Sequence, residues 1–271
     1  MKAESTLERS QSQGWRMGLK NILSRENNTW WKTSRWWVQT LVWGVIINGI
    51  LILLLFLMPL IVRTFEDVDQ SQLAEIPGGV EIFFSMAGIA LPIGVVILVQ
   101  GSVITEKEQG TAEWVLSKPV SRSAFILSKL IAHGLGILAT MIVFQSSLAY
   151  GLIWLKQGSP LPVWDFLKGV GILGILVFFY LTLTMMMEVL ADKRGVVLGV
   201  SLGSALGGAL LVQIIPGLAF ITPFALPNFA PLVALGSPPA EFPIWLPVTG
   251  TAVMSLVFAT IALRRFNQKP L

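Results

Sequence analysis

The stretch WWVQTLVWGVIINGILILLLFLMPLIV, residues 36–62, decides the fold class of this chain. It contains no charged side chain, and it is longer than the roughly 20 apolar residues that a helix needs to cross a bilayer. Hydrocarbon offers no partners to backbone N–H and C=O groups, so such a segment must satisfy them within itself. The stretch therefore predicts a transmembrane α-helix.

Five further apolar stretches have the same character. They cover residues 82–104, 130–155, 170–190, 196–215 and 244–263. The whole chain is 54% hydrophobic and only 13% charged, whereas a soluble domain carries about 25% charged residues. The sequence thus predicts an all-α integral membrane protein with a six-helix domain over residues 36–263.

The basic residues predict an orientation. Sixteen of the 19 Lys and Arg residues fall in the leader 1–35, the connection between helices 2 and 3 with the foot of helix 3, the turn between helices 4 and 5, and the tail 264–271. Arg63, Lys156 and Lys168 lie on the opposite side. Loops rich in Lys and Arg stay in the cytoplasm, so both termini are expected there. The basic leader is interpreted as an orientation signal, and no nucleic-acid partner is expected.

Two segments outside the regular spans have their own patterns. In the leader, Trp15, Leu19, Ile22 and Leu23 share one helical face, which predicts an amphipathic helix at the membrane interface; a disordered tail is the alternative. Residues 216–243 are apolar and contain seven prolines, so they cannot form one continuous helix. They predict a broken re-entrant segment in the outer leaflet.

The composition excludes several kinds of chemistry. The chain has no cysteine, one histidine and no GxxxxGK[ST] phosphate-binding motif, so no metal site, no cofactor and no ATP hydrolysis are expected in it. Gly199-Val-Ser201-Leu-Gly203 matches GxSxG, and Ser201 with His133 gives an intramembrane serine protease as an alternative function. A secondary transporter is a further alternative, although it fits poorly with so few intramembrane charges.

The glycines of helix 5 recur at every fourth residue, as Gly195, Gly199, Gly203 and Gly207. Residues at this spacing share one helix face, which predicts close packing against another helix; a substrate path is the alternative. Glu188 lies near the inner end of helix 4. It is expected to pair with Lys193 or Arg194, and a functional role is the alternative.

The most informative segment is EKEQGTAEWVLSKPVSRSAFILSKL, residues 106–130. Thr111 can cap a short helix, Pro119 would end it, and Ser121 or Ser123 can cap the next helix. The short helix would expose Trp114, Val115 and Leu116. An apolar patch on this loop, residues 105–123, predicts a docking surface.

This segment resembles the first cytoplasmic loop of ABC-2-type transporter permeases, the membrane subunits of ABC exporters. The residues that carry the resemblance are Glu106, Glu108, Gly110, Thr111, Glu113, Leu116, Ser117, Pro119, Val120, Ser121, Arg122 and Lys129. The resemblance implies that the loop is the coupling helix, with contacts to an ABC ATPase expected from Glu106, Glu108, Gly110, Thr111, Glu113, Trp114, Leu116, Pro119 and Arg122.

The same resemblance implies the partners and the location. ATP and Mg would bind to separate ATPase subunits, so this chain would not itself be an enzyme. A second permease copy or a paralogue would complete a dimer among membrane lipids of a bacterial or archaeal plasma (inner) membrane. The transported substrate is left open, as is the choice between a channel and a lateral opening.

Overall fold

The computed structural model describes residues 14, 16–64, 78–238 and 242–268, and the regular elements within these ranges are helices. Six of the helices are long and apolar enough to cross a membrane. They run Arg35–Ile61, Gly79–Glu108, Arg122–Gln157, Val163–Leu190, Arg194–Ile214 and Trp245–Gln268. The predicted all-α fold with six long apolar helices is confirmed, and the chain is a multi-pass membrane protein by helix length and composition.

Several of these long helices consist of more than one element. The first contains α2 (Arg35–Trp43), η1 (Gly44–Asn48), α3 (Gly49–Ile52), η2 (Leu53–Leu57) and α4 (Met58–Thr64). The second contains α6 (Gly79–Val99) and α7 (Ile104–Glu108), and the third contains α9 (Arg122–Ile137), η3 (Leu138–Val143) and α10 (Phe144–Gln157). The last three are α11 (Val163–Leu190), α12 (Arg194–Ile214) and α14 (Trp245–Gln268).

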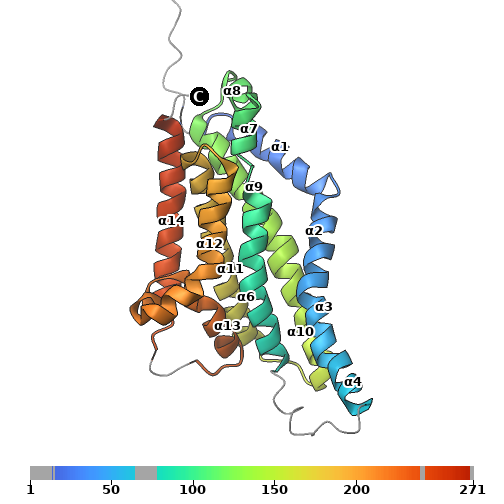
Figure 1. The fold of residues 1–271 in the computed structure, drawn as a ribbon. Coiled ribbons are helices and arrows are strands. Elements are labelled where there is room, and N and C mark those ends of the chain that lie inside the picture. The colour runs from blue at the N-terminus through green and yellow to red at the C-terminus, as the bar shows by residue number, and fades with distance from the viewer. Residues whose placement is uncertain (1–13, 15, 65–77, 239–241, 269–271) are drawn as a thin grey trace, which may run out of the picture.

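The bundle is built around α11, which contacts α6, α12 and α14 along its length. Figure 1 shows α1 (Leu19–Trp31), α7 and α8 (Thr111–Leu116) gathered at one end, which we call the α8 end. The opposite end carries α4 and α13 (Leu226–Ala234), and we call it the α13 end. The starts of α9 and α12 and the end of α14 lie at the α8 end, so chain segments distant in sequence meet there (Figure 1).

Three π-helical turns interrupt the spans, at η1, η2 and η3. Wider turns leave backbone groups that need other partners inside a membrane. Gln145 is one side chain beside these turns, and its Nε2 donates to the carbonyls of Thr40 in α2 at 2.9 Å and Thr140 in η3 at 3.0 Å. Its Oε1 accepts from Asn48 at 2.8 Å. This buried polar contact joins the first and third spans.

The proline-rich segment is broken, as its sequence predicts. It contains two 3₁₀ turns, η4 (Pro216–Phe220) and η5 (Pro223–Ala225), followed by α13. α13 packs on α6 and α11 with Leu226, Ala230 and Ala234 buried. The contacts are close: a Cβ at Gly88 of α6 would lie 2.6 Å from a side-chain atom of Pro227.

The leader helix α1 lies along α9. Ile22 is buried and Leu23 is half-buried, while Lys20 and Arg25 are exposed, so the predicted faces are present. Trp30 is 1% exposed, and its ring occupies the space that a side chain at Gly136 would need. Residues 1–13 and Trp15 of the leader 1–35 lie outside the described residues, as do 239–241 of the segment 216–243 and 269–271 of the tail.

Candidate functional site

The segment between α6 and α9 contains two short helices. α7 and α8 are separated by Gly110, whose φ of 67° lies in the left-handed region where glycine costs least. Thr111 follows as the first residue of α8, so the prediction that it caps this helix is wrong. Gly110 holds the N-cap position, and the Thr111 hydroxyl donates to the carbonyl of Glu106 at 3.1 Å. α8 ends at Leu116, shortly before Pro119, as predicted. The next helix is capped by Ser121, whose side chain accepts from the N–H of Ala124 at 3.0 Å.

α8 presents one face outward and one face inward. Trp114 is 61% exposed and Glu113 is exposed, whereas Ala112 and Val115 are buried. The prediction that Val115 is exposed is therefore wrong, since residues three apart lie on the same helix face and Ala112 is also buried. Leu116 is half-buried rather than exposed. The indole of Trp114 is covered only in part, by Lys118, whose Nζ lies 3.7 Å from the ring centroid.

A buried carboxylate holds the turn that leads into α7. Glu188, near the end of α11, accepts hydrogen bonds from the backbone N–H groups of Gly101, Ser102 and Val103. The Ser102 hydroxyl donates to the same carboxylate at 2.7 Å. Gly101 has a φ of 104°, which only glycine adopts readily, so three successive N–H groups can turn toward one carboxylate. The expected pairing of Glu188 with Lys193 or Arg194 is wrong.

Two basic side chains strengthen the same junction. Lys107 of α7 donates to the carbonyls of Glu188 at 3.1 Å and Val189 at 3.4 Å, which belong to the last turn of α11. Cations are favourable at this position because the last carbonyls of a helix have no partners within it. Arg194, at the start of α12, donates to the side chain and the carbonyl of Gln100.

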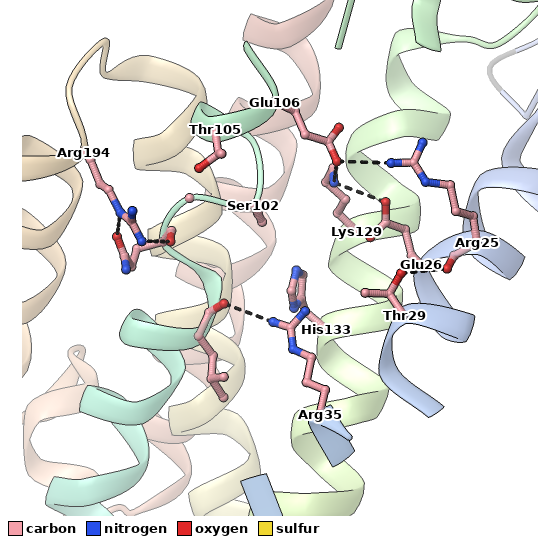
Figure 2. A pocket seen from close by; sticks show the side chains of 13 residues that line it. Arg25, Glu26, Thr29, Arg35, Ser102, Thr105, Glu106, Lys129, His133 and Arg194 are labelled. Carbon is pink, nitrogen blue, oxygen red and sulfur yellow. Dashed lines mark hydrogen bonds and ion pairs between the residues drawn. The ribbon is translucent and has the colours of Figure 1, made fainter. Parts of the chain in front are cut away.

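Four charged side chains link α7 to α1 and α9. Lys129 of α9 lies 2.8 Å from Glu106 and 3.2 Å from Glu26, and Arg25 lies 3.5 Å from Glu106 (Figure 2). The Lys129 side chain is only 3% exposed, so a missing partner would leave a buried charge uncompensated. Glu106 is thus directed into the protein, and only Glu113 and Glu108 are exposed among the predicted acidic residues.

The end of α14 closes the arrangement. Its Phe266 stacks on Phe125 of α9 with the ring centroids 5.4 Å apart, and Asn267 donates to the Ser123 hydroxyl at 2.8 Å. Arg122 donates to the Asn267 carbonyl at 3.4 Å. The segment that carries α8 is therefore attached to α1, α9, α11, α12 and α14.

The sequence predicted one functional segment that contains Glu106, Gly110, Thr111, Glu113 and Trp114. In the structure these residues lie on α7, on α8 and at the turn between them. The sequence prediction missed Arg25, Glu26 and Lys107 among the residues that anchor this segment to the bundle, and it gave Glu188 and Arg194 the wrong partners. Lys129 belongs to the quoted motif, so the motif pointed to one anchor. The burial of Glu188 within an apolar helix was the only signal for the other contacts.

The glycine face of α12 is open within this chain. No described atom lies within 4 Å of a Cβ built at Gly195, Gly199, Gly203 or Gly207. Gly208, on another face, does pack: a Cβ there would overlap the ring of Phe224. Packing of the four glycines against a helix therefore remains a prediction, and no described part of this chain supplies that helix.

Ser201 and His133, the pair behind the protease alternative, are not hydrogen-bonded to each other. Both are buried, and neither Ser201 Oγ nor His133 Nδ1 has a hydrogen-bond partner among the described residues. A serine nucleophile needs a base within hydrogen-bond reach, so this geometry does not favour the protease. Among the described residues, no group of three or more His, Cys, Asp or Glu side chains could hold a metal ion.

The fold and the site define a multi-pass helical membrane protein whose short helix α8 is attached to most of the bundle. The chain belongs to the family described as "Protein of unknown function (DUF2705)", whose model matches residues 45–270. This match covers all six long helices except the first residues of the first one. No curated protein matches the chain.

Proposed function

We propose that this chain is the permease subunit of an ABC exporter, which moves a substrate across or out of the plasma membrane with ATP hydrolysed by a separate subunit. The observation that carries the proposal is the exposed Trp114 on a helix at the tip of the α8 end (Figure 1). Large aromatic side chains dominate the energetics of small protein interfaces. The sequence motif around this residue resembles the coupling loop of ABC-2-type permeases.

The contacts behind α8 support a coupling role. A force on α8 reaches α11 through Glu188. It reaches α9 and α1 through the ion pairs of Glu106 with Lys129 and Arg25. Most of these contacts involve a charged group, and such hydrogen bonds are stronger than those between neutral groups. A partner that pulls on α8 would therefore move several helices together, which a transport cycle requires.

The orientation forms part of the proposal. The α8 end faces the cytoplasm, because most Lys and Arg residues belong to segments that meet there. α1 then lies at the cytoplasmic membrane interface, and the broken segment 216–243 enters the bilayer again from outside at the α13 end. A bacterial or archaeal plasma membrane is the location that the resemblance implies.

The partners follow from the same proposal. ABC ATPase subunits with their ATP and Mg dock on α8, and a second permease copy or a paralogue forms the dimer. The open glycine face of α12 supports an additional helix from outside this chain, because small residues let helices approach closely.

Affinity purification of the full chain from its own membranes tests this proposal. The expected result is a co-purified subunit that carries a GxxxxGK[ST] motif and hydrolyses ATP, with less of it recovered for Trp114→Ala. Recovery of no such subunit in a mild detergent would contradict the proposed function.

A further inference from the structure

A pocket of about 360 Å³ opens at the α8 end, between α1, the start of α2, the end of α6, α7, α9 and the start of α12. This volume lies at the lower end of the range for ligand pockets, about 300–1,000 Å³. Its lining includes four basic and two acidic side chains, so it carries an excess of two positive charges. These are Arg25, Glu26, Arg35, Glu106, Lys129 and Arg194, and we call this site the basic pocket (Figure 2).

Each carboxylate of the basic pocket has a basic partner through its Oε1, whereas Oε2 of Glu106 has no hydrogen-bond partner among the described residues. Both lie within ion-pair distance of Lys129, and Glu106 also pairs with Arg25. Neither Arg35 nor Arg194 has a carboxylate within ion-pair distance among the described residues. Arg35 donates to the Leu98 carbonyl at 3.4 Å and lies over the ring of Trp30. Arg194 donates to the side chain and the carbonyl of Gln100. Two guanidinium groups from different helices therefore line one pocket, and among the described residues their hydrogen-bond acceptors are neutral oxygens rather than an ion-paired carboxylate.

His133 adds an unpaired polar atom. It lines the pocket, is 4% exposed, and its Nδ1 has no hydrogen-bond partner in the described part of the chain. Figure 2 shows its ring between Arg35 and Lys129. Buried polar atoms in native proteins nearly always have a partner, so an unpaired one beside a pocket indicates a bound group. An imidazole N–H can donate to an anion oxygen.

We propose that the basic pocket binds a phosphate-bearing anion between Arg35 and Arg194, with His133 as a further donor. Guanidinium groups bind phosphate oxygens with paired, charge-assisted hydrogen bonds. The pocket lies where α2 begins and α6 ends, at the α8 end of the long apolar helices, and basic pockets between membrane helices bind anionic headgroups. The phosphate belongs to a headgroup or is free in solution. The bound anion joins α2 to α12, and this proposal does not depend on the exporter assignment.

Affinity measurements on the purified full chain in neutral detergent test this site. One arm titrates phosphatidylglycerol against phosphatidylcholine, and the other titrates inorganic phosphate against chloride at equal ionic strength. Saturable binding of phosphatidylglycerol alone identifies a lipid headgroup, and saturable binding of phosphate as well identifies a site for the free anion. Absence of preferential binding in both arms overturns the proposal.

Matched variants separate this pocket from general surface charge. Arg35→Gln and Arg194→Gln should each weaken binding about tenfold to a hundredfold, as expected for loss of a charged hydrogen bond. Glu26→Gln should strengthen binding, because it removes a negative charge from the lining. Lys193→Gln removes an exposed positive charge that is next to Arg194 in the sequence but does not line the pocket, so this variant should bind the anion like the wild type.

Arg194 is exposed, so the Arg194→Gln variant should fold even if Arg35→Gln does not. Wild-type affinity in Arg194→Gln would overturn the proposal.

Discussion

Glu188 determines the path of the chain between α6 and α7 through one side chain. Its carboxylate accepts from three successive backbone N–H groups and one hydroxyl, and the side chain is fully buried. Without this carboxylate, the N–H of Val103 would be left unpaired in a buried position, whereas Gly101 and Ser102 are half-buried beside the basic pocket. An unpaired buried donor costs about 1–3 kcal/mol, so this contact matters for stability as well as for position.

Glu188→Ala should therefore lower the free energy of unfolding by at least about 1 kcal/mol for each buried donor that loses its acceptor. It should also increase hydrogen exchange in residues 100–108. Glu188→Gln should have a smaller effect, because its amide keeps one acceptor oxygen. The measurements are thermal unfolding in detergent and hydrogen exchange of the 100–108 peptide. Asp165→Asn is the control, because it breaks the largely exposed ion pair with Lys168 and should change stability by less than about 1 kcal/mol. Unchanged exchange in Glu188→Ala would contradict this role.

The role of Glu188 could not be read from the sequence. Local reasoning offered Lys193 and Arg194, because they follow within six residues. The true partners are backbone groups more than 80 residues away, and backbone N–H groups leave no signature in residue type. The positive φ of Gly101 depends equally on the fold.

At the scale of single elements, α12 offers a comparison between two kinds of glycine. Gly203→Leu should leave the fold of the single chain intact, because no described atom lies near its Cβ position. It should reduce the dimer fraction, because a large side chain keeps a second helix at a distance. Gly208→Leu should instead destabilise the single chain, because it would overlap Phe224.

Cross-linking of the detergent-solubilised protein and thermal unfolding measure these two effects. A Gly203→Leu chain that forms dimers as well as the wild type would show that this face is not a helix-packing surface.

The elements differ in how well their sequences predict them. The six long helices follow from apolar length, and the capping by Ser121 follows from its hydroxyl. The inner face of α8 could not be predicted, because α8 has only six residues and both of its faces carry apolar side chains. Burial of Ala112 and Val115 rather than Trp114 depends on tertiary packing.

Across the whole molecule, docking of an ATPase on α8 requires that the α8 end faces the cytoplasm. The chain has no cysteine, so single cysteines can report each side. Lys118→Cys at the α8 end and Ser159→Cys between α10 and α11 are both at exposed positions. An impermeant thiol reagent applied to intact cells should label Ser159→Cys and not Lys118→Cys. The reverse pattern would invert the orientation, and with it the site of ATPase docking.

The affinity of the purified chain for its ATPase tests the proposed docking on α8 most directly. Trp114→Ala should weaken binding by about 2 kcal/mol, or roughly thirtyfold, because a largely exposed aromatic residue is the expected interface anchor. Glu113→Lys should also weaken binding of the ATPase, because it reverses the charge at the interface. Trp164→Ala is the control, since Trp164 is 78% exposed in the first turn of α11, at the opposite end of that helix from Glu188. If both α8 variants bind the ATPase and support its ATP hydrolysis in liposomes like the wild type, α8 is not the coupling element.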